Sequence, residues 1–251
     1  MSDQALPDRL ALLAGEGERF AAAVERGPLD APIAACPGWD LRALAAHVGG
    51  VHRWAVEAVR AAARPSTSPA ALGTGAPGSA AELAGWIRAG VGDLCAALAA
   101  AGDDAPTWHP FPAPQVTGVW ARRQLHETAV HRLDADAATG VAAELDPALA
   151  ADGIDEYLEL TLPRRVARDG VAWPGGSLHV HCTDTAGEWT VRVAGGDYVF
   201  TREHAKGDAA LRGPALGLLL RLWGRSFPPA DSPEVIGDAA VAGEWLANGG
   251  T

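Results

Sequence analysis

Cysteine is scarce in this chain, and its placement argues against a cysteine-based scaffold. The 251 residues include three cysteines, Cys36, Cys95 and Cys182, which lie far apart and form no CxxC pair. An odd number at these spacings does not favour a disulfide framework or a cysteine-rich zinc knot. We therefore expect a protein of the reducing cytoplasm. The first four residues, Met1 to Gln4, lack the apolar core of a signal peptide, which agrees with this expectation.

Positive charge and long apolar runs are also scarce. Twenty Lys and Arg residues stand against 31 Asp and Glu, which gives a net charge of −11. An acidic chain without a basic cluster is poorly suited to phosphate backbones or anionic lipids, so we expect neither nucleic acid nor membrane as a partner. No uninterrupted apolar run reaches the ~18 residues of a membrane span. Hydrophobic residues make up 48% of the chain, which is enough for a sizeable core.

Helical periodicity dominates the first part of the chain. Apolar residues at helical spacing predict four helices, at about 5–26, 40–63, 80–101 and 115–138. Asp40 is the expected N-cap of the second helix. Residues 64–79 read as a linker, and residues 103–114 hold four prolines and are predicted to be irregular. Four helices of this kind predict a bundle, a fold that commonly builds metal sites from facing helices.

The pattern changes after the fourth helix. A fifth helix is predicted at 146–162, and alternating residues at 177–183 and 189–193 predict a hairpin, with a third strand at 198–201. Two short helices are expected at 216–223 and 241–247. The sequence therefore predicts an α+β protein: an N-terminal four-helix bundle at 1–145 and a smaller C-terminal α+β domain at 146–251.

One helical segment carries a pair of potential metal ligands. Glu127 and His131 are four residues apart, so their side chains lie one above the other on a helix. His47 in the second helix would complete a set of two histidines and one carboxylate with room for water or substrate, which is typical of catalytic sites. The alternatives are a solvated helix face for the pair and a core histidine for His47. Neither His52 nor His126 shares the face of its neighbouring ligand, because helical spacing rotates each of them away.

These residues lie in segments that resemble a known family. The run CPGWDLRALAAHVGGVHRW, residues 36–54, is similar to the N-terminal signature of the mycothiol-dependent maleylpyruvate isomerases. The run HETAVHRLDA, residues 126–135, resembles the second motif of that family, and the C-terminal domain is also similar, including residues 213–214 and 220–225. The family is actinobacterial, and its N-terminal domain is a DinB-like four-helix bundle.

The resemblance implies a function and its site. It implies a divalent metal, most simply zinc, on His47, Glu127 and His131, and a thiol cofactor, mycothiol, at the open metal position. A metal-bound thiol is deprotonated at neutral pH. In the isomerases this thiolate adds to a cis double bond, and elimination after rotation leaves the trans product; related proteins transfer the thiol to an electrophile. The resemblance also implies a C-terminal arginine for a substrate carboxylate, for which Arg225 is the first candidate and Arg221 the second.

We therefore predict a metal-dependent and mycothiol-dependent isomerase or S-transferase that acts on a small electrophilic substrate. The expected oligomeric state is a monomer. A metal-dependent hydrolase and a non-enzymatic zinc-bearing regulatory or binding protein are the alternatives. Nickel, iron and cobalt also suit the donor set.

Several other residues receive a first interpretation. Asp134 and Gln124 are either groups that support the metal ligands or solvent-facing residues. Trp39 and Trp54 are interpreted as core or pocket wall, and Cys36 as a turn residue rather than a nucleophile. Trp108, His109 and Phe111 in the proline-rich loop are predicted to line a pocket mouth. His179 and His181 are predicted to lie on an exposed sheet face, where they could bind metal adventitiously.

Overall fold

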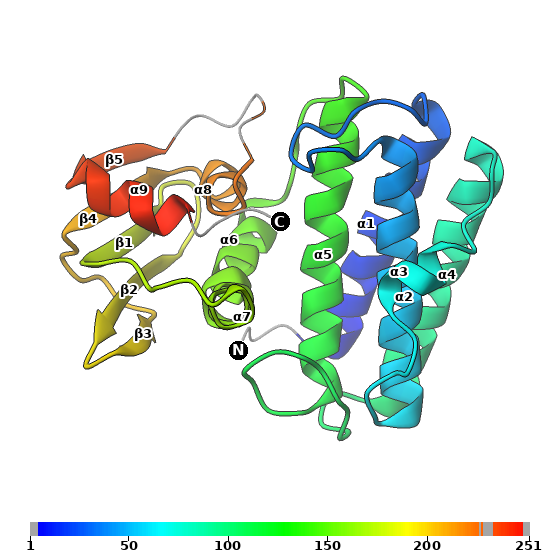
Figure 1. Cartoon of the computed structure of the whole chain (residues 1–251), viewed down its shortest axis with the longest axis horizontal. Helices are drawn as coiled ribbons and strands as arrows, with labels where there is room; N and C mark the ends of the chain where they lie inside the picture. Colours follow the sequence, from blue (N-terminus) through cyan, green and yellow to red (C-terminus); the bar gives the residue numbers. More distant parts are fainter. Residues whose placement is uncertain (1–4, 226, 228–232, 248–251) are drawn as a thin grey trace. The chain divides into compact units, whose positions relative to one another are not determined.

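The computed structural model describes residues 5–225, 227 and 233–247. Met1 to Gln4, where the sequence predicts no signal peptide, lie outside the described residues. The chain divides into two compact units, Met1–Ala142 and Ala143–Thr251. The first unit is helical and the second combines helices with a sheet (Figure 1), which confirms the predicted α+β class.

Four long helices build the N-terminal unit, as the sequence predicts. They are α1 (Leu6–Arg26), α2 (Leu41–Ala61), α4 (Ala80–Ala101) and α5 (Thr117–Ala138). Both α1 and α2 pack against α4 and α5, so that the four helices run side by side as a bundle (Figure 1). Leucine, valine and alanine side chains from all four helices form its core.

Local capping explains where the helices of the bundle begin and end. The Asp40 carboxylate accepts a hydrogen bond of 2.7 Å from the Ala43 amide and caps α2, as predicted. Ser79 caps α4, which ends at Gly102 with a φ of +80°. The predicted linker at 64–79 holds a short helix, α3 (Pro69–Gly73), which the sequence did not indicate because Gly and Pro dominate its surroundings.

The helix α4 is long and apolar enough to cross a membrane by length and composition, since an 18-residue window has a mean hydropathy of 1.3. Arg88 and Asp93 interrupt this segment, which is why the sequence shows no uninterrupted apolar run. Its buried residues, among them Leu83, Ile87 and Leu94, lie in a helix that packs against α1 and α2. The core helix of a soluble bundle can have the same length and composition as a membrane-spanning helix. The expectation that this protein has no membrane partner stays a prediction.

The C-terminal unit begins with a longer helical segment than the sequence predicts. The expected helix at 146–162 consists of α6 (Pro147–Glu156) and a π-helical turn, η1 (Tyr157–Thr161), and it continues into α7 (Leu162–Asp169). Pro163 does not end the helical segment, because it lies in the first turn of α7, where a missing amide proton is tolerated.

A five-stranded sheet forms the rest of this unit, in the order β3-β2-β1-β4-β5. The strands are β1 (Ser177–Cys182), β2 (Glu188–Ala194), β3 (Asp197–Thr201), β4 (Ala209–Gly213) and β5 (Glu234–Gly237). The predicted hairpin and third strand are β1 to β3, whereas β4 and β5 were missed. The strand β4 pairs with β1 in parallel, and all other pairs are antiparallel.

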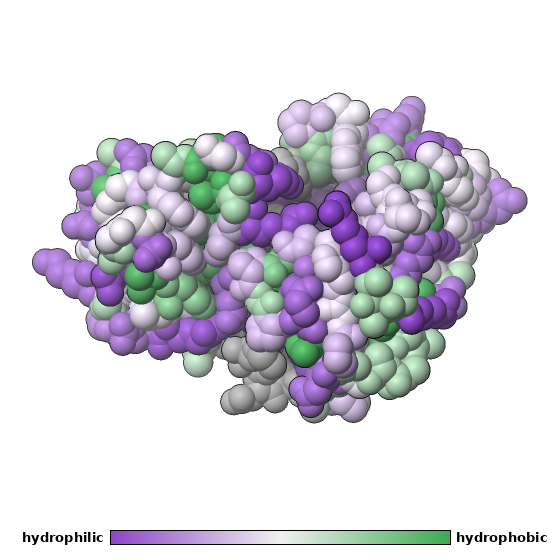
Figure 2. Space-filling view, turned by 60° about the horizontal axis from the view of Figure 1, so that its bottom comes forward, coloured by the Kyte–Doolittle hydropathy of each residue, from purple (hydrophilic) through white to green (hydrophobic). Residues whose placement is uncertain are grey.

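Two helices pack within the C-terminal unit. The helix α8 (Ala215–Leu222) packs against α6 and β4, and α9 (Ala239–Ala247) packs against β1, β4 and β5. The face of the molecule in Figure 2 mixes hydrophilic residues with small hydrophobic groups. Among the described residues, the exposed large hydrophobic side chains are Val141, Val171, Val235 and Ile236.

Candidate metal centre

Two helices of the bundle bring together the three predicted metal ligands. His47 lies in α2, two turns after the Asp40 cap, and Glu127 and His131 lie in the middle of α5. One donor atom from each of the three side chains lies within 4.8 Å of the other two. The side chain of His131 is 5% exposed, that of Glu127 15% and that of His47 32%, so the group is buried on one side and open at His47.

Both imidazoles direct the same nitrogen at one carboxylate oxygen. The Nε2 atom of His47 lies 3.3 Å from Oε1 of Glu127, and the Nε2 atom of His131 lies 3.4 Å from that same oxygen. Ligands that hold zinc tetrahedrally at about 2.0–2.2 Å are separated by about 3.4 Å. The donor types and their spacing therefore fit a divalent transition metal.

Two further side chains of α5 orient these ligands. Nδ1 of His131 lies 2.9 Å from Oδ2 of the buried Asp134, so a proton shared on that side leaves Nε2 free to bind a metal. Arg123 donates a hydrogen bond of 2.6 Å to Oε2 of Glu127, the oxygen that the histidines do not contact. Asp134 was an expected supporting group, whereas Arg123 was missed, although its i,i+4 spacing from Glu127 was a usable signal.

The surroundings favour the charged forms of Glu127 and His131. Burial alone would raise the pKa of Glu127, but Arg123 and the hydrogen bonds with His131 and His47 hold it well below its usual range. Burial alone would lower the pKa of His131, but Asp134 and Glu127 outweigh this effect and raise it to about 8. Without a metal, these shifts favour a buried ion pair between Glu127 and His131.

The loop before α2 lies beside the same site. The thiol of the buried Cys36, Nδ1 or Nε2 of His131 and a carboxylate oxygen of Asp134 also lie within 4.8 Å of one another, which makes them a second possible donor set. The ring of Trp39 lies 4.9 Å from the ring of His47 between centroids. This position suits the interpretation of Trp39 as a pocket wall. Cys36, which was interpreted as a turn residue, lies closer to the ligands than expected.

The competing histidines take other roles. His52 is fully buried, and its Nε2 atom lies 2.9 Å from the hydroxyl of Thr128. Burial lowers its pKa to about 4, so this histidine is neutral at pH 7. His126 is also buried, and neither residue belongs to the donor groups found in the described part of the chain. Gln124 is fully buried too, and its side-chain amide has no hydrogen-bond partner among the described residues.

The aromatic residues of the 103–114 loop form a separate cluster. Trp54 packs edge-on against Trp108 and Trp120 at 5.4 and 5.5 Å between ring centroids. His109 is 2% exposed and its Nε2 atom lies 2.8 Å from the Pro114 carbonyl oxygen. The expectation that His109 lines a pocket mouth is therefore wrong, because the loop folds back on itself and buries the ring.

The two arginines proposed for the substrate lie in the C-terminal unit and differ in burial. Arg221 is exposed in the last turn of α8. Arg225 is 2% exposed, and its guanidinium donates a hydrogen bond of 2.7 Å to the Trp223 carbonyl. The choice between them stays a prediction.

Comparison with protein families gives matches in both units. The family model of the mycothiol maleylpyruvate isomerase N-terminal domain matches residues 10–136, and that of the corresponding C-terminal domain matches residues 148–244. A solved structure, described as the crystal structure of the mycothiol-dependent maleylpyruvate isomerase, is similar with a TM-score of 0.63 and 14% identity, over 94% of this chain and 95% of that chain. This likeness shows a shared fold. A comparison with the curated proteins gives no match.

The bundle and its donor group define the class: a helical-bundle protein that carries the two-histidine, one-carboxylate donor set of divalent-metal enzymes. The two family matches cover most of the sequence, one in each compact unit. The chain belongs to the mycothiol maleylpyruvate isomerase family. The predicted membership in this enzyme family is thereby confirmed.

Proposed function

We propose that this protein is a metal-dependent and mycothiol-dependent isomerase that converts a small cis-configured, carboxylate-bearing electrophile into its trans isomer. The observation that carries the proposal is the group of His47, Glu127 and His131 in a chain of this family. The family supplies the thiol dependence, and the donor group supplies a place where a thiol can be activated. We also assign the bundle to the DinB-like type.

The donor group suits a zinc ion held by His47, Glu127 and His131. A bound zinc ion with an open coordination position keeps a thiol deprotonated at neutral pH. Two imidazole nitrogens and one carboxylate oxygen leave such a position, because zinc in catalytic sites binds three protein ligands. Zinc is preferred over nickel, iron and cobalt here because of its availability rather than its geometry.

The residues around the ligands have defined tasks in this proposal. Asp134 holds the Nδ1 proton of His131 and fixes the tautomer that offers Nε2 to the metal. Arg123 holds the second oxygen of Glu127 and keeps this carboxylate ionised. Trp39 covers one side of the His47 ring and limits access of water. The buried amide of Gln124, which lacks a described protein partner, suits a polar ligand.

Arg225 is our candidate for the group that binds the substrate carboxylate. A guanidinium holds a carboxylate through two parallel hydrogen bonds, which lysine does not reproduce. The proposal predicts that Arg225→Lys raises KM more than it lowers kcat, whereas Arg221→Lys at the exposed end of α8 changes neither.

The experiment that tests the function is a calorimetric titration of mycothiol into the full-length protein after its zinc content has been measured. His131→Ala should abolish both zinc and thiol binding, and His52→Gln, a buried histidine outside the donor group, should retain both. Thiol binding that persists in His131→Ala would refute the metal-thiol assignment. Failure of the zinc-loaded protein to bind mycothiol would refute the thiol dependence.

A further inference from the structure

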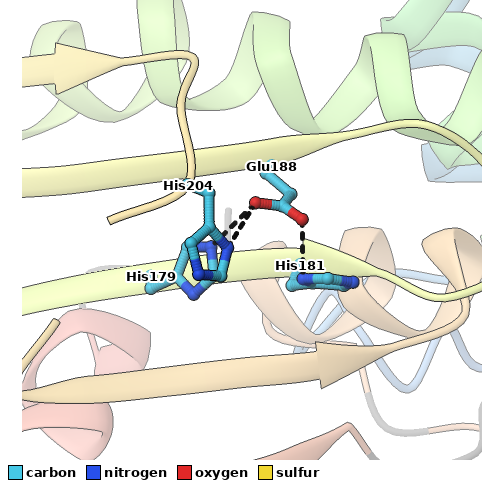
Figure 3. A group of neighbouring side chains, drawn as sticks. All are labelled: His179, His181, Glu188 and His204. Carbon is cyan, nitrogen blue, oxygen red and sulfur yellow. Dashed lines mark hydrogen bonds and ion pairs between the residues drawn. The ribbon is translucent and has the colours of Figure 1, made fainter. Parts of the chain in front are cut away.

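A second cluster of metal-binding side chains lies on the sheet of the C-terminal unit. It consists of His179, His181, Glu188 and His204. The two histidines of β1 are two residues apart and therefore face the same side of the sheet. Glu188 of β2 pairs directly with His181 in the sheet register, and His204 follows β3 (Figure 3). Three segments of the chain thus contribute to one group.

The three histidine side chains converge on the Glu188 carboxylate. Nδ1 of His181 lies 3.0 Å from one carboxylate oxygen, and Nδ1 of His204 lies 2.7 Å from the other. Nε2 of His179 lies 3.6 Å from the oxygen that faces His204. The three imidazole rings are nearly perpendicular to one another, with interplanar angles of 86–87°. One donor atom from each of the four side chains lies within 4.8 Å of the other three. Figure 3 shows the histidines around the Glu188 carboxylate, and their rings do not stack.

His179 is the least expected member of this group. The predicted position of His179 on an exposed sheet face is wrong: it is 7% exposed, because the segment after β3 covers it. Its Nε2 atom is buried and has no hydrogen-bond partner among the described residues. A buried polar atom without a partner is costly, and one that points at three other donors is explained by a ligand that all four share.

We propose that His179, His181, Glu188 and His204 form a second divalent transition-metal site, distinct from the donor group of the bundle, with zinc as its expected occupant. Three imidazoles and one carboxylate are donors that zinc prefers, and four protein ligands close a tetrahedral site. Ligands of such a site are separated by about 3.4 Å. The three histidine nitrogens lie 2.7–3.6 Å from a Glu188 oxygen, and all four donors lie within 4.8 Å of one another, so an ion would draw them together.

The arrangement points to a structural role for this site. All four coordination positions are filled by the protein, which leaves none open for a substrate. The site joins β1, β2 and the segment after β3, which Thr190 also holds through a weak hydrogen bond to the Glu203 carbonyl. The exposed Arg212 of β4 lies opposite His181 in the sheet register, and Glu234 of β5 lies opposite Arg212. His204 is largely exposed, so an ion reaches the site from solvent.

The test is a zinc titration of the metal-free, full-length protein, with bound zinc counted by mass spectrometry after equilibrium dialysis. The wild-type protein should bind two zinc ions. Glu188→Gln should bind one, with the affinity of the lost site reduced by at least about 100-fold, because a direct ligand matters more than an outer partner. The matched control is Glu203→Gln, which changes a neighbouring exposed carboxylate outside the cluster and should leave two ions bound.

A second readout separates this site from the proposed active site. His131→Ala should also bind one zinc ion, and zinc should raise the unfolding temperature of His131→Ala but not of a His131→Ala, Glu188→Gln double variant. Unchanged zinc stoichiometry in both Glu188→Gln and His204→Gln would overturn the proposal, as would a second ion that binds only at millimolar zinc. Loss of one ion in Glu188→Gln with none lost in His131→Ala would support this site while refuting the one in the bundle.

Discussion

The hydrogen bond between His131 and Asp134 makes the strongest prediction about the bundle site. Asp134 is buried, and its carboxylate lies 2.9 Å from Nδ1 of His131. Asp134→Asn keeps the shape of the side chain but removes its charge. A neutral amide holds the Nδ1 proton less strongly, and if it turns its NH2 group to Nδ1 it moves the proton to Nε2, where the metal should bind.

The magnitude of this effect follows from the position of Asp134 behind a metal ligand. Loss of such an outer partner weakens metal binding by about 10- to 100-fold. This corresponds to about 1.4–2.7 kcal/mol. The assay is competition for zinc between the metal-free protein and a chromophoric chelator. The control is Asp93→Asn, which makes the same change at an exposed position of α4 outside the donor groups. Its zinc affinity should stay within about twofold of the wild type.

The same assay separates the two donor groups that share His131. If Cys36, His131 and Asp134 held the metal, Asp134→Asn would remove a ligand, and Cys36→Ser would weaken zinc binding as strongly. With His47, Glu127 and His131 as ligands, Cys36→Ser leaves the affinity unchanged. Zinc binding by Asp134→Asn at wild-type strength would refute the role assigned to Asp134.

Two further predictions concern stability. Gly50→Ala should destabilise the protein by about 1–3 kcal/mol, because the new Cβ would collide with the Pro69 carbonyl oxygen. Gly92→Ala, in an open part of α4, should stabilise it by about 0.5–1 kcal/mol. Urea unfolding measures both effects, and equal effects would contradict this packing. His52 has a pKa of about 4 in the folded protein against 6.5 in the unfolded chain, so the unfolded state binds more protons between these pH values. The free energy of unfolding therefore falls as the pH is lowered from 6.5 to 4, by about 3 kcal/mol in total. His52→Gln, which keeps a hydrogen-bonding group for Thr128, should show a smaller loss over this range in unfolding experiments at a series of pH values.

The sequence predicted the bundle well because its signals are local. Asp40 marks the start of α2 through its carboxylate and Gly102 marks the end of α4 through its positive φ, and helical periodicity follows or precedes each of them. The strands β4 and β5 were missed for the opposite reason. The sequence AALRG of β4 has no β-branched residue, and the strand forms because it pairs with β1 about 30 positions earlier.

The candidate site shows the same division between local and distant information. The i,i+4 spacing indicates that Glu127 and His131 share a helix face, and it would also have shown Arg123 beside them. Spacing alone does not bring His47 to that face, because this requires the packing of α2 against α5. The family resemblance supplied this contact, and the structure has His47 within 3.3 Å of Glu127. His179 was misplaced because its cover comes from His204, a residue of another segment.

The composition of α5 shows how the bundle holds a polar group in its interior. Nearly the whole helix is buried, although it carries arginines, aspartates and histidines. Burying a charge is costly unless a partner of opposite charge accompanies it. Arg132 accordingly contacts Glu16 of α1 at 2.8 Å and Asp136 at 3.1 Å, while Arg123 contacts Glu127 at 2.6 Å.

These pairs fix the rotation of α5 about its own axis, since turning the helix would leave several charges buried without partners. The apolar residues of α5 do not impose this constraint, because they are spread around the helix. The same rotation directs Glu127 and His131 toward His47 on α2. In this bundle the ion pairs of Arg132 with Glu16 and Asp136 therefore act on the candidate site through its geometry, because they hold α5 in the rotation that directs its ligands at His47.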